Sequence, residues 1–266
     1  MPHTHDVAIG ETTVRKTYVS WTQREHDREW DALVHLDVHA PGLAPRPVSR
    51  FEVDGRPGVE MGRVEGAPLD GVLSARQTVE LVIALERLFA VPVPDDLGLR
   101  ANDPAAFQDR FRAWLEDDRA LTACDDPDLV ELAVAHARSW LVANPPTDDW
   151  VVEPVLALGD GNLDNVLWDG HTCRLIDWEE YGVSDRAYEL ADVVEHASSR
   201  LEGRLDATAF LAACDLTGPQ TLRVEHHRRM FACFWLAMLL PGNPGWHRNP
   251  PGSVEDQARW VLELLA

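Results

Sequence analysis

The chain has 266 residues, of which 45% are hydrophobic and 26% charged, and its 45 acidic and 24 basic side chains give a formal charge of −21. This length fits one large domain or two modest domains that share a cleft. The negative charge argues against nucleic acid or an anionic membrane as a partner and would attract a cationic small molecule, although a surface kept soluble by acidic side chains is the simpler explanation.

The first third of the chain predicts a small sheet with one helix. Residues 12–20 are rich in Thr and Val and alternate in the manner of a strand. Thr22 and Glu25 have the spacing of a capping box, and apolar residues recur at helical intervals after them. Two further strands, at about 47–53 and 58–64, are expected on either side of an Asp-Gly turn.

Beyond a hinge-like segment at residues 65–71, the pattern becomes mostly helical. Ser74 and Gln77 form a second capping box ahead of an apolar helical repeat. Pro104 and Pro127 each follow an aspartate, which suits the first position of a helix. The aromatic and apolar stripes on these helices predict core packing.

Residues 150–177 interrupt the helical pattern and predict a β-hairpin. Asp169–Gly170 is a strong two-residue turn signal, and such a turn pairs Trp168 with His171 and Val166 with Cys173. The open end of this hairpin then carries Asn165 and, just past the second strand, Asp177.

The loop that contains Asp160 curls over the same open end. One amide and two carboxylates, from Asn165, Asp177 and Asp160, therefore converge there. Oxygen ligands of this kind suit Mg²⁺, which takes one or two carboxylates together with phosphates and water. Each of these residue types is also common in turns.

The last third of the chain returns to helix, with Ser184 as the expected N-cap. The longest apolar run, residues 230–240, is too short to span a bilayer and predicts a buried helix. No secretory signal is visible at the start, so we expect a cytoplasmic protein without a membrane partner. The four cysteines are widely spaced and predict buried free thiols (Cys124, Cys173, Cys214 and Cys233).

The order of these motifs resembles the aminoglycoside phosphotransferase and choline kinase-like family. Its pattern of His-Gly-Asp-x-x-x-x-Asn followed by Ile-Asp-Trp-Glu is matched here by Gly159–Asp160, Asn165 and Ile176–Glu179. The resemblance implies an α+β, protein-kinase-like two-lobe fold. Residues 1–66 would form the N-terminal, nucleotide-binding lobe, and residues 67–266 a larger, mainly helical lobe with the catalytic loop and the metal-binding hairpin.

The resemblance also implies the roles of individual residues. Asp160 would accept or orient the proton of the substrate hydroxyl, and Asn165 and Asp177 would hold Mg²⁺. Lys16 would anchor the phosphates of ATP or GTP, and Glu29 would hold Lys16. Phosphoryl transfer needs little more, because it depends mostly on positioning and electrostatics.

The same resemblance implies that Met61, Gly62 and Val64 line the adenine pocket. Apart from the resemblance, the acidic residues Glu179, Glu180, Asp185 and Glu189 are candidates to line a cationic substrate site, although a solvated helix explains them at least as well. The expected activity is transfer of the γ-phosphate of ATP to a hydroxyl of a small molecule, such as an aminoglycoside or another amine-bearing alcohol.

Two departures from the family pattern leave other functions open. Leu158 stands where the family has a histidine that braces the catalytic loop. Only 15 residues with one glycine, Gly10, precede Lys16, which leaves space for one strand near 6–9 but not for the full glycine-rich hairpin over the phosphates. Either the true start lies upstream or that hairpin is missing.

The alternative is a catalytically inactive kinase-fold protein that binds a ligand or a partner. A metal-dependent phosphoesterase ranks last, because it needs a second metal about 4 Å away and Asp164 is the one additional ligand we can name.

Overall fold

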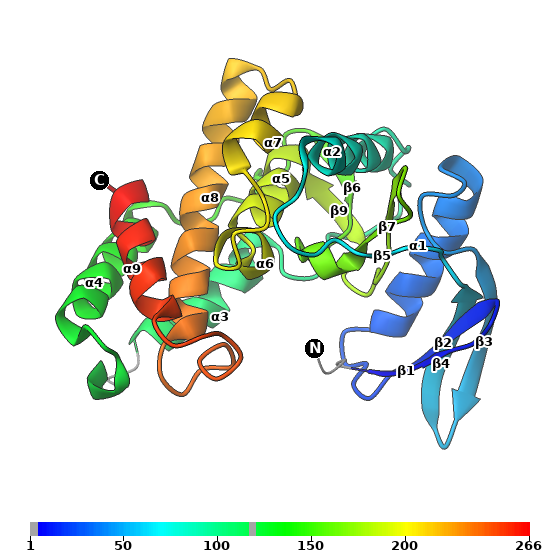
Figure 1. Cartoon of the computed structure of the whole chain (residues 1–266), viewed down its shortest axis with the longest axis horizontal. Helices are drawn as coiled ribbons and strands as arrows, with labels where there is room; N and C mark the ends of the chain where they lie inside the picture. Colours follow the sequence, from blue (N-terminus) through cyan, green and yellow to red (C-terminus); the bar gives the residue numbers. More distant parts are fainter. Residues whose placement is uncertain (1–4, 117–120) are drawn as a thin grey trace.

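The computed structural model describes residues 5–116 and 121–266. A four-stranded antiparallel sheet of order β1-β2-β4-β3 and helix α1 form one end of the molecule, and most of the helices form the other (Figure 1). This arrangement is α+β, as expected. The elements of the sheet end are β1 (Asp6–Ile9), β2 (Thr13–Thr17), α1 (Glu25–His39), β3 (Pro47–Val53) and β4 (Arg56–Gly62).

The details of this end correct two predictions. Strand β4 begins at Arg56, two residues earlier than expected, because the tight turn from β3 takes only two residues. The capping box at Thr22 is wrong. Helix α1 begins at Glu25, with Arg24 in a left-handed conformation and no side-chain cap, and the Glu25 carboxylate accepts the N–H of Gln23 at 3.0 Å. Glu25 is thus the first helical residue, whereas a capping box needs it at the third.

Helix α8 (Gly218–Leu239) packs against several of the remaining helices, among them α5, α9 and α3. None of the helices within the described ranges is long and apolar enough to cross a membrane. The other bounds are α2 (Ala75–Phe89), α3 (Pro104–Glu116), η1 (Leu121–Ala123), α4 (Pro127–Ala143), η2 (Leu163–Asn165), α5 (Arg186–Glu195), α6 (Ala197–Arg200), α7 (Ala207–Ala213) and α9 (Ser253–Leu264).

Several helix starts agree with the sequence signals. The Ser74–Gln77 capping box at the start of α2 is confirmed in both directions. Helices α3 and α4 begin at Pro104 and Pro127, as expected. Ser184, in contrast, is not the cap, because α5 begins at Arg186, one residue later than a cap at Ser184 requires. The carboxylate of Asp185 caps α5 by accepting the N–H of Ala187 at 2.9 Å.

Two small sheets lie between the two ends. One contains β5 (Ala67–Pro68), β7 (Val166–Trp168) and β8 (Cys173–Leu175), and the other pairs β6 (Pro154–Ala157) with β9 (Gly182–Asp185).

The hairpin of β7 and β8 exists, but its predicted register is wrong. Trp168 pairs with Cys173, and the loop has four residues, not two. The reason is the Asp169 carboxylate, which accepts the N–H groups of His171 and Thr172 at 2.8 Å each and so stabilises the longer loop. The register differs by two residues, so each side chain stays on its expected face.

The hairpin is tied directly to the sheet end. The N–H of Leu175 donates to the carbonyl of Leu43, just beyond α1, at 2.9 Å. Arg28 of α1 donates to the carbonyl of Tyr181 at 2.7 Å. These two contacts hold the segment after β8 beside α1. The boundary between residues 66 and 67 stays a prediction.

Candidate functional site

The side chain of Lys16 lies at the centre of the site. It is buried on strand β2, and its ammonium is 2.9 Å from the carboxylate of Glu29 and 2.8 Å from that of Glu179, with Asp177 also in contact. Burial opposes the positive charge, but the attraction of Glu29 and Asp177 outweighs it and raises the pKa of Lys16 well above its usual value. Lys16 is therefore a fixed cation.

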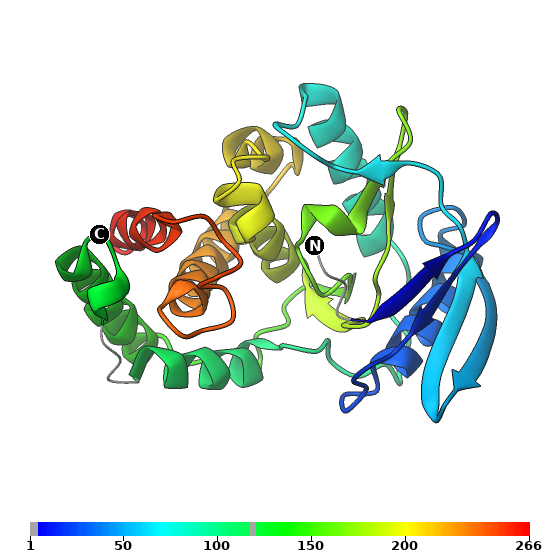
Figure 2. The ribbon, with the colours of Figure 1, turned by 60° about the horizontal axis from the view of Figure 1, so that its bottom comes forward.

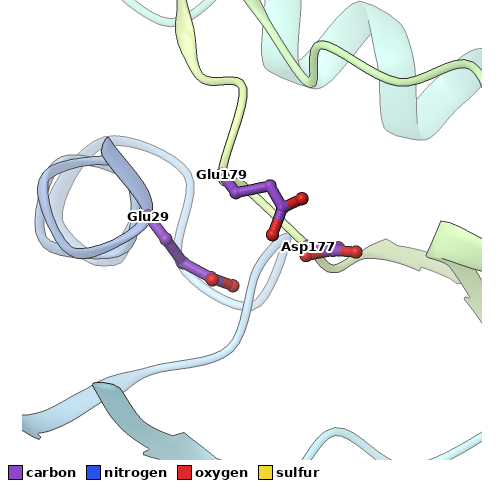
Figure 3. Close-up of side chains that lie close together, drawn as sticks. All are labelled: Glu29, Asp177 and Glu179. Carbon is purple, nitrogen blue, oxygen red and sulfur yellow. The ribbon is translucent and has the colours of Figure 1, made fainter. Parts of the chain in front are cut away.

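Three carboxylates gather around this cation from two distant parts of the chain. Glu29 comes from α1, and Asp177 and Glu179 come from the loop after β8 (Figure 3). One oxygen of each lies within 4.8 Å of the others. Asp177 has a left-handed backbone with φ of 68°, a conformation that is uncommon for non-glycine residues and that aspartate adopts more readily than most.

Glu29 is anchored by more than Lys16. The hydroxyl of Tyr18 donates to its carboxylate, and the N–H of Trp178 donates to the other oxygen at 3.4 Å. Because Trp178 is fully buried and lies between Asp177 and Glu179 in the chain, this contact fixes where both acids emerge.

His5 is a member of the site that the sequence did not suggest. Its Nδ1 accepts the N–H of Val19 at 3.2 Å, and its Nε2 is 2.9 Å from Glu179, so the start of β1 lies beside the segment after β8 (Figure 2). Burial would raise the pKa of Glu179, but the hydrogen bond from His5 and the charge of Lys16 lower it to about 2. Glu179 is thus ionised, and its role toward a substrate stays a prediction.

Asp160 and Asn165 form the second part of the site. The side-chain amide of Asn165 donates to Oδ2 of Asp160 at 3.2 Å, and its backbone carbonyl accepts the N–H of Ile176 at 2.9 Å. The second contact places Asn165 beside the residue that precedes Asp177. Because the amide nitrogen is used by Asp160, the amide oxygen is the atom left to face a cation. Together with the Asp177 carboxylate, it provides hard ligands of the kind that Mg²⁺ takes.

The backbone of the Asp160 loop passes through a space that only glycine fits. Gly159 has φ of 95°, and a Cβ there would lie 2.3 Å from the Cβ of Glu180. A Cβ on Gly161 would lie 2.5 Å from a backbone carbon of Asp192. Leu158 is buried in the core and packs there.

Arg100 braces this loop, and sequence reasoning missed it. Its side chain is 2% exposed, and its guanidinium donates to the carbonyl of Gly159 and to Glu189 and lies 3.3 Å from Asp192. The N–H of Gly159 donates to Glu189 at 3.4 Å. Arg100, from the connection between α2 and α3, and the acids of α5 thus hold Gly159, the residue before Asp160. The apolar side chain of Leu158 provides no hydrogen bond to this loop.

Glu180 belongs to this second cluster. Its carboxylate accepts the side-chain amide of Asn102 at 2.6 Å and lies 3.6 Å from Arg100. Burial raises the pKa of Glu180 to about 7, in spite of Arg100. Its role toward a substrate also stays a prediction.

The expected adenine segment lies at the end of β4. The side chain of Met61 is buried, and the N–H of Gly62 donates to the carbonyl of Arg46 at 2.7 Å. The N–H of Gly62 is therefore already used. The predicted contact with the adenine would therefore use the carbonyl of Gly62 and the backbone of Val64.

Comparison of the sequence with known families identifies a phosphotransferase family. The profile of the phosphotransferase enzyme family matches residues 4–230, which is most of the chain. No curated protein sequence is similar enough to count as a relative.

Solved structures with this fold include several phosphotransferases. A choline/ethanolamine kinase family protein from Mesorhizobium loti has 15% identity and a TM-score of 0.62, covering 100% of this chain and 86% of its own. Aminoglycoside phosphotransferase APH(4)-Ia has 16% identity and a TM-score of 0.62, covering 98% of this chain and 94% of its own.

The ADP-bound aminoglycoside phosphotransferase APH(2'')-Ib has 14% identity and a TM-score of 0.60, covering 99% of this chain and 90% of its own. At these identities the similarity shows the fold, and it confirms the expected protein-kinase-like class.

Proposed function

Because the chain belongs to the phosphotransferase enzyme family, we propose that it is a kinase that transfers the γ-phosphate of ATP or GTP to a hydroxyl of a small molecule. The observation that carries this proposal is the buried Lys16, held by Glu29 and facing Asp177. A fixed cation beside metal-binding oxygens is what the phosphates of a nucleotide require.

On the nucleotide side, Lys16 would bind phosphate oxygens, and Glu29 would keep its ammonium in place. Asn165 and Asp177 would hold Mg²⁺, which when bound would offset the negative charge on the phosphates. Met61, Gly62 and Val64 would contact the adenine. The ADP bound to one solved structure of the same fold supports a nucleotide as co-substrate.

On the acceptor side, Asp160 would orient the hydroxyl and take up its proton. Its carboxylate is 40% exposed, so a substrate can reach it. The formal charge of −21 favours a cationic acceptor, such as an aminoglycoside or another amine-bearing alcohol, and Glu179 and Glu180 are candidates to face it. We expect no nucleic acid or membrane partner, and a cytoplasmic location.

The inactive binding module stays the alternative. Within the described residues, β1 is the single strand that precedes β2, the strand of Lys16. The phosphoesterase is less well supported, since the Asp164 carboxylate is 2.7 Å from Arg204 and paired with it.

A two-stage experiment separates these functions. The melting temperature is measured with millimolar ATP or GTP, with and without Mg²⁺, because a ligand of the folded state stabilises it by RT ln(1 + [L]/Kd). Transfer of radiolabelled γ-phosphate is then measured with a panel of aminoglycosides and amino alcohols. We expect a Mg²⁺-dependent shift that is lost in Asp177→Ala, and transfer that is lost in Asp160→Asn.

The matched control is Asp54→Asn, on the exposed turn between β3 and β4. It should retain both the shift and the transfer. Full transfer by Asp160→Asn would refute the role of Asp160, and a protein that binds neither nucleotide would be the binding module.

A further inference from the structure

The side chain of His196 lies against Asp160, at the junction of α5 and α6. Its Nε2 atom is 3.4 Å from Oδ1 of Asp160, and the side chain is 13% exposed. The ring packs edge-on against Trp235 of α8, with centroids 4.9 Å apart. His196 is therefore held in place by packing, whereas the side chain of Asp160 is 40% exposed.

Hydrogen bonds to the other ring nitrogen fix the tautomer of His196. Its Nδ1 accepts the N–H of Ser198 at 3.1 Å and lies 2.8 Å from the hydroxyl of Ser198. That hydroxyl oxygen accepts the N–H of Leu163 at 3.0 Å, so its own proton is available to Nδ1. An Nδ1 that accepts leaves the proton of the neutral ring on Nε2, facing Asp160. Burial lowers the pKa of His196 and so favours the neutral ring.

The donors around Asp160 are distributed unevenly. Oδ1 accepts the N–H of Asn162 at 3.1 Å and faces the Nε2–H of His196. Oδ2 accepts one donor, the amide of Asn165 at 3.2 Å. Each carboxylate oxygen can accept about two hydrogen bonds, so Oδ2 retains the free capacity.

We propose that His196 is a positioning residue that fixes the rotamer of Asp160 and directs Oδ2 toward the acceptor hydroxyl. This inference rests on the proposed kinase function. The Ser198 hydroxyl adds a second connection, because it links His196 to the backbone of the same loop at Leu163. The α5–α6 junction thus orients the carboxylate without touching the substrate.

Two substitutions separate positioning from structure. His196 is also the N-cap of α6, through Nδ1. His196→Asn keeps an acceptor at the Nδ1 position, since Asn is a good N-cap, but it has no atom at Nε2. His196→Gln can place an amide N–H near the Nε2 position but fits the cap poorly.

We expect kcat to fall about tenfold to a hundredfold in His196→Asn, the size of effect that a misplaced reacting group produces, with the KM for ATP unchanged. His196→Gln should melt at a lower temperature than His196→Asn and yet turn over faster. If kcat instead follows the melting temperature across the two variants, His196 is merely structural and the proposal is overturned.

A measurement without turnover distinguishes failure of this proposal from failure of the kinase function. Long-range ¹H–¹⁵N spectra of the imidazoles are recorded for the wild type, Asp160→Asn and Asp54→Asn. We expect the wild type to show the Nε2–H tautomer of His196. Relative to the wild type, the Nε2 resonance of His196 should shift in Asp160→Asn and stay unchanged in Asp54→Asn. If the wild type shows no transfer activity but the His196 resonance still shifts in Asp160→Asn, the kinase function is refuted and the contact between His196 and Asp160 is retained. If the His196 resonance does not respond to Asp160→Asn, the inference itself is refuted.

Discussion

Replacement of Arg100 by methionine tests the brace of the Asp160 loop. The substitution keeps much of the side-chain volume but leaves Glu189, Asp192 and the Gly159 carbonyl without their common donor in a site where the side chain is 2% exposed. Breaking a buried ion pair costs about 3–5 kcal/mol. At this chain length, such a loss lowers the melting temperature by on the order of 10 °C.

The assay is thermal unfolding, with Arg259→Met as the matched control. Arg259 is 60% exposed and pairs with Asp256 at 2.8 Å, and an exposed pair contributes about 0–1 kcal/mol. Equal melting temperatures for the two variants would refute the brace.

The dependence of this loss on pH provides a second test. Burial raises the pKa of Asp192 well above its usual value even with Arg100 present. A carboxyl whose pKa is raised by folding stabilises the protein at low pH and less as the pH rises through the raised value. The deficit of Arg100→Met should therefore shrink as the pH falls, because protonation removes the uncompensated charge. A deficit that grows toward low pH would contradict this explanation.

Three further predictions concern caps, backbone and titration. Ser74→Ala should cost about 1 kcal/mol in unfolding free energy and Thr22→Ala almost nothing, as urea unfolding would show. Gly159→Ala should lower both the melting temperature and the turnover. Gly170 has the same φ of 95°, but a Cβ there would meet no atom within 4 Å, so Gly170→Ala should cost only the backbone strain of about 1–3 kcal/mol. Equal losses of stability in the two variants would contradict the close contact at Gly159. The pKa of Glu180 rises from about 4.3 in the unfolded chain to about 7 in the folded protein. The stability that Glu180 contributes at low pH is therefore lost as the pH rises through 7. The free energy of unfolding of Glu180→Gln should accordingly depend less on pH between pH 4 and 7 than that of the wild type.

The sequence was most informative where the site is built from one continuous segment. The spacing of Asp160, Asn165 and Asp177 follows from a loop and a hairpin that are close in the chain, so the motif could be recognised. The contact of Lys16 with Glu29 is also present, because a strand and the next helix pack together predictably. The roles of these residues stay proposals.

The supporting residues could not be predicted, since they come from segments far apart in the chain. Arg100 lies 59 residues before Gly159, and His5 lies far from Glu179. Only the folded chain brings His196 back to Asp160. The hairpin register failed for a local reason, because the turn signal at Asp169–Gly170 does not reveal that Asp169 will bind two backbone N–H groups.

The charges around Lys16 explain why nucleotide binding should require Mg²⁺. One ammonium faces three carboxylates, so the group has an excess of negative charge before any phosphate arrives. Two like charges about 4 Å apart repel by about 4 kcal/mol at an effective dielectric constant of 20. A nucleotide without a cation would meet this repulsion at Asp177 and Glu179. If, as proposed, a divalent cation accompanies the phosphates, these acids would be its ligands or neighbours, so the change in melting temperature with ATP should vanish without Mg²⁺.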